Sequence, residues 1–143
     1  MRQAVELVGL VTAGVFTGGA LFAALVEHPA RSRAGTAVSL AVFEAGYRRA
    51  ALAELVAAAV TVIACTAATA LGGRALWLIA GLVIGAAIPV AVAVAPINRR
   101  LLEARAENEE TPELLRRWAR LHELRTALAV VGFVLVAVAA LGL

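Results

Sequence analysis

Three side chains with distinct chemistry lie at helical spacing near the C-terminus. Trp118 and His122 are four residues apart, and Arg125 follows three residues later. Residues three and four positions apart share one face of a helix, so these side chains would stack along one side. Histidine exchanges a proton near neutral pH, arginine binds anionic oxygens, and tryptophan lines pockets for aromatic ligands. The same spacing is also typical of an aromatic and arginine belt at the headgroups of a membrane.

A carboxylate, Glu54, lies at the start of a strongly apolar stretch. An ionisable side chain at membrane depth is costly, and it is usually paired with another group or has a function. Two interpretations are open. One is a salt bridge to Arg48, Arg99 or Arg125, and the other is a proton acceptor or a ligand-binding carboxylate.

Metal binding is a weaker interpretation. Four side chains offer nitrogen or oxygen ligands: His28, His122, Glu27 and Glu54. Two histidines could also ligate haem axially. However, the sequence contains no HxxxH or HExxH motif and a single cysteine, Cys65, so we expect no metal ion and no cofactor. The sequence has neither a P-loop nor a dinucleotide-binding pattern, and a Ser–His–Asp triad is excluded because the chain has no aspartate.

Four uncharged stretches separate these polar positions: residues 7–26, 55–73, 75–98 and 126–143. Each has about 18 residues or more, which is enough for a helix to cross the hydrocarbon core of a bilayer. A soluble domain of 143 residues could not bury a chain that is 62% hydrophobic. Backbone groups in lipid need internal partners, and the stretches lack the alternation of barrel strands, so they predict helices.

The sequence therefore predicts an all-α integral membrane four-helix bundle with antiparallel up-down topology, in one transmembrane domain over residues 1–143. We expect the transmembrane helices at about residues 4–27, 47–71, 74–95 and 112–143. A helix from Thr111 to Leu143 would be about 46 Å long, which exceeds the hydrocarbon core of about 30 Å. Its extended amphipathic start would therefore lie outside the hydrocarbon, and only about residues 123–143 would cross it.

Proline and glycine mark three expected boundaries. Pro29 should end the first helix, and Pro89 should kink the third. Pro96 marks the end of that helix or a second bend. Gly72 and Gly73 should end the second helix in a tight turn that leads into an antiparallel neighbour.

Threonine marks two expected helix starts. Thr36 would cap a short interfacial helix over residues 37–44, within a polar connection that ends where the second helix begins near Tyr47. Thr111 would cap the last helix, after a charged loop at residues 99–111.

The arginines predict the orientation. All thirteen basic residues are arginine, and only Arg2 and Arg74 lie at the membrane face opposite the first and third connections. The positive-inside rule puts those two connections in the cytoplasm and both termini outside. The richness in arginine and alanine suggests a bacterial inner membrane. Because the arginines flank membrane spans, we expect contact with the lipid bilayer and no nucleic acid.

Antiparallel topology brings the polar helix ends together at the cytoplasmic side. The side chains concerned are Glu27, His28, Tyr47, Arg48, Arg49, Glu54, Asn98, Arg99, Trp118, His122, Glu123 and Arg125. Both histidines of the chain belong to this set. We therefore expect the chemistry of the protein at this face.

Four segments of the sequence resemble the anthrone oxygenase family, a group of small four-helix membrane proteins: residues 27–31, 43–49, 96–101 and 118–125. The most specific are Asn-Arg-Arg-Leu at 98–101 and Trp-x3-His-x2-Arg at 118–125. The resemblance implies oxidation of an anthrone, or a similar hydrophobic aromatic molecule, to a quinone with dioxygen and without an evident cofactor.

The resemblance and the residue chemistry together suggest roles. His122 or Glu54 would remove a proton from the substrate, and Arg125 or Arg99, with Asn98, would stabilise the resulting anion. We assign the catalytic roles to His122, Glu54, Arg125 and Asn98, and the substrate contacts to Trp118, Tyr47, Arg99 and His28.

Three other functions are open. A binding or transport accessory would have an ion-paired, closed cluster without a pocket. A subunit of a larger complex, or a homo-oligomer, would use the GxxxG steps Gly14–Gly18 and Gly81–Gly85 to face a partner. A metal or haem protein would use the two histidines.

Overall fold

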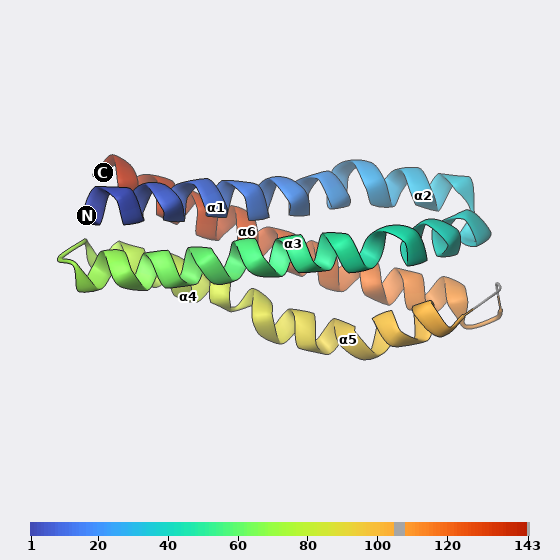
Figure 1. Ribbon diagram of the computed structural model, residues 1–143. Helices are drawn as coiled ribbons and strands as arrows, with labels where there is room; N and C mark the ends of the chain where they lie inside the picture. Colours follow the sequence, from blue (N-terminus) through green and yellow to red (C-terminus); the bar gives the residue numbers. More distant parts are fainter. Residues whose placement is uncertain (105–107, 143) are drawn as a thin grey trace.

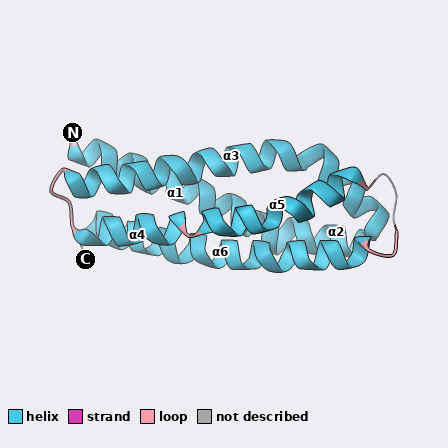
Figure 2. Ribbon diagram, turned by 90° about the horizontal axis from the view of Figure 1, so that it is seen from below, coloured by secondary structure: helices cyan, strands magenta, loops and turns pink. Residues whose placement is uncertain are grey.

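The computed structural model describes residues 1–104 and 108–142, except the side chains of Glu44, Ala45 and Arg48. Its elements are α1 (Arg2–Phe22), a π-helical turn η1 (Ala23–Glu27), α2 (His28–Ala34), α3 (Thr36–Ala70), α4 (Ala75–Gly85), α5 (Ala87–Glu103) and α6 (Thr111–Leu141). These elements form four long rods, and the described part of the chain contains no strand (Figure 2). The predicted all-α fold is confirmed.

Four helical segments are long and apolar enough to cross a membrane: Arg2–Ala34, Arg49–Ala70, Ala75–Glu103 and Thr111–Leu141. The chain is therefore compatible with a multi-pass membrane protein. Figure 1 shows both termini at the end of the bundle that holds the α3–α4 turn, with the α2–α3 turn at the other end. Both α1 and α4 pack between α3 and α6, as antiparallel up-down topology requires.

The first rod does not end at Pro29, contrary to prediction. The π-helical turn Ala23–Glu27 precedes α2, and the N–H of His28 donates to the carbonyl of Ala23. Pro29 then lies in the first turn of α2, where its missing N–H is not needed. The rod therefore continues to Ala34, and Gly35, with a φ of 96°, ends it.

The second rod is longer than predicted. Residues 37–44 are not a separate interfacial helix, and no helix begins near Tyr47, because α3 is continuous from Thr36 to Ala70. Gly35, rather than Thr36, is the N-cap residue. At 1.5 Å per residue α3 is about 52 Å long, so its first turns extend beyond a core of about 30 Å. Its predicted end is confirmed, since Gly72 turns the chain with a φ of 83°.

The third rod bends where Pro89 predicts. Pro89 cannot donate to the carbonyl of Gly85, and the helix breaks at Ala86, between α4 and α5. The rod does not end near Ala95, because Pro96 lies inside α5, which continues to Glu103. After the break, α5 departs from α3, whereas α4 lies close to it (Figure 1).

The fourth rod, α6, is unbroken as predicted. Glu110, rather than Thr111, is its N-cap residue, and the side chain of Asn108 holds the turn that precedes the helix. The Asn108 Oδ1 accepts hydrogen bonds from the N–H of Glu110, the N–H of Thr111 and the Thr111 hydroxyl, at 3.0, 3.0 and 2.8 Å. Residues 99–103 of the predicted loop belong to α5. The rod ends at Gly142, whose φ is 74°.

The GxxxG glycines pack inside the chain. A Cβ at Gly14 would lie 3.5 Å from Phe133, one at Gly81 would lie 2.9 Å from Cys65, and one at Gly85 would lie 3.8 Å from Val62. Gly81 and Gly85 therefore bring α4 against α3, and Gly14 brings α1 against α6. These contacts occupy three of the four glycines that a partner protein would need.

Candidate functional site

A cavity of about 260 Å³ lies among α1, η1, α2, α3, α5 and α6. Of these, α2 and α5 lie toward the end of the bundle opposite the termini (Figure 1). Its walls are largely apolar. The polar side chains that line it are Glu27, Arg31, Tyr47, Glu54, Asn98, Trp118, His122 and Arg125. Six of the predicted site residues are in this set, namely His122, Glu54, Arg125, Asn98, Trp118 and Tyr47. The volume is near the lower end of the range for small-molecule sites, roughly 300–1,000 Å³.

An ion pair joins α3 to α6 at the base of the cavity. Arg125 donates to the carboxylate of Glu54, and both side chains are largely buried, with 12% and 17% exposure. Of the three salt bridges considered for Glu54, the structure therefore contains the one to Arg125. Taking this pair out of water carries a desolvation cost, which mutual attraction offsets only if the geometry is good.

The helix α1 supports this pair from behind. Gly19 faces the Glu54 carboxylate so closely that a Cβ there would lie 3.2 Å from Oε1. Two hydrogen bonds hold α1 against α6 on either side: Thr17 donates to the carbonyl of Ala129 at 3.0 Å, and Thr126 donates to that of Ala20 at 3.3 Å. The position of Glu54 thus depends on a helix outside its own.

His122 has a defined tautomer. Its Nδ1 lies 3.0 Å from the carbonyl oxygen of Trp118, one helical turn earlier. A carbonyl only accepts, so Nδ1 carries the proton and the Nε2 of the neutral ring is an acceptor. The Trp118 ring lies beside it, with ring centroids 3.9 Å apart. The predicted stacking of Trp118 and His122 along one face of α6 is therefore present.

His28 lies behind the cavity instead of lining it. Its ring centroid is 4.4 Å from that of Trp118 and 5.6 Å from that of His122. It lines a neighbouring cavity of about 460 Å³ together with Ser32, Ser39 and other residues of α2, α3 and α6. The two histidines thus come together, but the residues that the structure describes contain no group of three or more potential metal ligands.

An amide and a phenol form the opposite wall. Asn98 of α5 donates from Nδ2 to the hydroxyl oxygen of Tyr47 of α3 at 2.6 Å. Because the Tyr47 oxygen accepts this bond, its own proton is free for another acceptor. Phe43, one turn earlier, stacks on Tyr47 with centroids 5.0 Å apart and meets Trp118 edge-on at 5.4 Å. The four-residue spacing of Phe43 and Tyr47 is the signal that could have identified Phe43.

Arg31 and Glu27 belong to the site, although the sequence analysis gave neither a role in substrate chemistry. Their side chains pair at 3.4 Å, and the Arg31 guanidinium lies 5.3 Å from the Trp118 ring centroid. Their spacing of four residues would have revealed the pair. Pro29 lies between them, and a helix that ended there would not bring the two side chains together.

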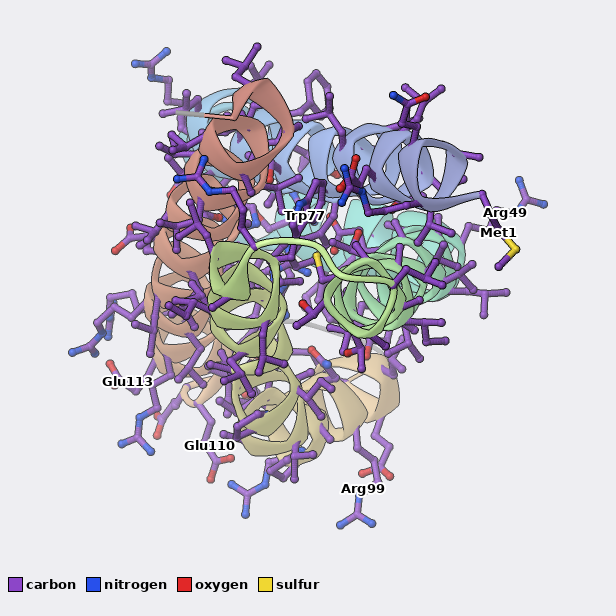
Figure 3. All side chains as sticks on the ribbon, turned by 90° about the vertical axis from the view of Figure 1, so that its left-hand side faces the viewer. Met1, Arg49, Trp77, Arg99, Glu110 and Glu113 are labelled. Atoms are coloured by element: carbon purple, nitrogen blue, oxygen red, sulfur yellow. The ribbon has the colours of Figure 1, made fainter. Side chains whose placement is uncertain are left out.

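Arg99, like His28, is a predicted site residue that does not line the cavity. Its side chain is 79% exposed and pairs with Glu103 at 3.9 Å. Figure 3 shows it pointing away from the bundle. The neighbouring Asn98, in contrast, is buried and lines the cavity.

Four buried side-chain polar atoms in the described part of the chain have no hydrogen-bond partner: His28 Nε2, Asn98 Oδ1, Trp118 Nε1 and Arg125 Nε. All belong to the cavity or to the ring packed behind it. Buried polar groups are nearly always hydrogen-bonded, so a bound ligand or ordered water would be expected to satisfy such a cluster. The site therefore keeps hydrogen-bonding capacity that the folded chain does not use itself.

Comparison with known proteins identifies the family of the chain. A sequence profile of the family described as anthrone oxygenase matches residues 40–135, which include Tyr47, Glu54, Asn98, Trp118 and His122. No curated protein and no solved structure gives a significant match. Because the profile covers more than half of the chain, the protein belongs to the anthrone oxygenase family.

Proposed function

We propose that this protein is a membrane-embedded oxygenase that oxidises the acidic methylene of a flat, hydrophobic, anthrone-type molecule with dioxygen. The observation that carries the proposal is a histidine with an acceptor nitrogen, beside a guanidinium, in an apolar cavity of a bundle that belongs to this family. The cavity walls suit an apolar ring system, and the polar groups suit the removal of a proton from it.

The charges in the cavity suit a neutral ligand. Glu27 pairs with Arg31 and Glu54 pairs with Arg125, so the charged side chains of the lining balance formally. A neutral molecule would therefore bind without leaving an unpaired charge in an apolar setting. Negative charge would develop only during the reaction, near two guanidinium groups.

His122 is the better placed of the two bases suggested by the sequence. Its Nδ1 proton is held by the Trp118 carbonyl, which leaves Nε2 to accept a proton from the substrate. The Glu54 carboxylate is already engaged, because Arg125 donates to it. We assign to Glu54 the role of fixing Arg125.

The anion formed by proton removal needs hydrogen-bond donors. The Nε of Arg125 and the hydroxyl of Tyr47 have no acceptor within the described chain, and both residues line the cavity. They would stabilise the oxygen of the enolate, while Asn98 holds Tyr47 in place. Trp118 and Phe43 would pack on the rings of the substrate.

The reaction balances with dioxygen as the only oxidant. His122 takes one proton of the methylene, and the resulting carbanion reduces dioxygen and forms a carbon–oxygen bond, which gives a peroxide. Loss of the second proton from the same carbon breaks the oxygen–oxygen bond. One oxygen atom becomes the new carbonyl and the other leaves in water, so anthrone and dioxygen give anthraquinone and water.

The test is dioxygen uptake by the purified protein in lipid nanodiscs with anthrone, corrected for uncatalysed oxidation. His122→Ala should lower the rate by roughly 10²- to 10⁴-fold, the usual contribution of a general base. Arg99→Gln, on the exposed side of α5, is the matched control and should keep the parental rate. If His122→Ala turned over at the parental rate, the assignment of the base would fail.

A binding accessory is the second candidate, because the ion pairs alone would also suit a non-catalytic site. Its predicted closed cluster does not agree with the cavity. Saturable binding of anthrone without any dioxygen uptake above background would favour this function over the oxygenase.

A further inference from the structure

The exposed residues of the cavity lining lie on two helices. They are Val42, Gly46, Ala50 and Leu55 of α3, and Ile88 and Ala91 of α5. The lining residues of the other elements are buried or half-buried. The cavity therefore has a mouth between α3 and α5, and its rim is apolar. We call these six residues the lateral mouth.

The lateral mouth faces the region where lipid would lie. Four of its residues fall inside the segments Arg49–Ala70 and Ala75–Glu103, which are apolar enough to cross a membrane, and Val42 and Gly46 lie just before the first segment. Large apolar side chains near it, such as Leu52 and Val92, are 64% and 68% exposed. Such exposure suits hydrocarbon and would be costly in water.

The bend at Pro89 explains why the mouth is open. Because α5 departs from α3 after the break at Ala86, the two helices pack only sparsely beside the cavity (Figure 1). The small side chains of Ala50 and Ala91 add little bulk to the rim. The bend of α5 and the small side chains on the rim thus both widen the mouth.

Among the described residues, no close neighbour of Gly46 requires a glycine at this position. Glycine inside a helix costs roughly 1 kcal/mol relative to alanine. Most helical glycines here pack against a neighbour, but a Cβ at Gly46 would meet no described atom within 4 Å. Gly46 is exposed and lines the cavity, so the missing side chain widens the mouth.

We propose that flat aromatic ligands enter the cavity sideways from the membrane, between α3 and α5, and that Gly46, at the edge of the membrane-spanning segment, sets the width of ligand that can pass. The nature of the ligand rests on the proposed function. The entry route is independent of that function, because ligand binding can be measured without turnover.

The experiment measures association and dissociation of anthracene, a flat and unreactive probe, by energy transfer from the tryptophans of protein in nanodiscs. The variants are Gly46→Ala, Gly46→Leu and Gly46→Phe. The matched controls are the same substitutions at Gly18, a helical glycine of α1 with no atom within 4 Å of its Cβ position and no place in the cavity lining.

A gate limits the rates of entry and exit alike. We expect both rates to fall progressively with side-chain size at position 46, by tenfold or more for Gly46→Phe, with the dissociation constant within about threefold of the parent. The variants of Gly18 should keep parental rates. Unchanged rates in Gly46→Phe, or a loss of affinity with parental association, would overturn the proposal.

Turnover separates this proposal from the proposed function. If the parent binds anthracene with gated rates but consumes no dioxygen with anthrone, the oxygenase fails and the lateral route stands. If it consumes dioxygen and Gly46→Phe keeps the parental turnover and binding rates, the route fails and the oxygenase stands.

Discussion

Replacing Gly19 with alanine should disturb the Glu54–Arg125 pair from outside the cavity. The new Cβ would lie 3.2 Å from Oε1 of Glu54, 3.7 Å from its Cγ and 3.9 Å from its Cδ. The first distance is tighter than nearly all real Cβ contacts, so the carboxylate must move by a few tenths of an ångström. Arg125, which Glu54 holds, would move with it.

The effect on stability is the sum of two opposed contributions. Alanine favours the helix by roughly 1 kcal/mol relative to glycine, whereas crowding of a buried carboxylate removes part or all of that gain. A misplacement of about 1 Å at a catalytic group costs about 10²-fold in rate. A shift of a few tenths of an ångström in Arg125 should therefore lower turnover by about threefold to tenfold.

Gly18→Ala is the matched control, since Gly18 neighbours Gly19 in α1 but has no atom within 4 Å of its Cβ position. It should raise the midpoint of thermal unfolding and keep the parental turnover with anthrone in nanodiscs. Gly19→Ala should gain less stability and lose turnover. Equal turnover of the two variants would refute the idea that the backbone of α1 positions Glu54.

Three further predictions concern stability, capping and orientation. Glu54→Gln or Arg125→Gln alone should lower the free energy of unfolding by about 3–5 kcal/mol, because each leaves a buried charge without its partner. The double variant Glu54→Leu/Arg125→Leu should recover much of this loss in thermal unfolding. Equal losses in all three variants would contradict the role of the ion pair. Asn108→Ala should lower the free energy of unfolding by about 1 kcal/mol, because the three hydrogen bonds to Oδ1 in the turn before α6 are lost. An unchanged midpoint of thermal unfolding would contradict a stabilising role for this turn. A cysteine introduced at Ser32 in a Cys65→Ala background should react with an impermeant maleimide from the cytoplasmic side only, and labelling from outside would reverse the proposed orientation.

The four rods could be predicted because lipid leaves few alternatives. Long uncharged stretches predict helices, and antiparallel neighbours bring alternate ends together. That reasoning placed Glu54 of α3, Asn98 of α5, and His122 and Arg125 of α6 around one cavity. The spacing on α6 was informative because i, i+4 and i+7 positions share a face in any continuous helix.

The missed parts depend on tertiary packing or on local departures from regular helix. A π-helical turn ahead of Pro29 is not visible in the residue types, so the Glu27–Arg31 pair was not expected. Whether Asn98 or Arg99 faces the cavity depends on how α5 is rotated about its own axis. Its buried residues Val94, Asn98 and Leu101 follow the helical repeat, and that pattern predicts that Arg99 faces outward.

The most direct test of the central claim is the fate of labelled dioxygen. Purified protein in nanodiscs is supplied with anthrone and ¹⁸O₂ under conditions where uncatalysed oxidation is subtracted, and the quinone is analysed by mass spectrometry. One ¹⁸O atom per quinone, formed at a rate that falls in His122→Ala, is the expected result. Quinone that carries no ¹⁸O, or formation at the same rate without the protein, would contradict an oxygenase at this site.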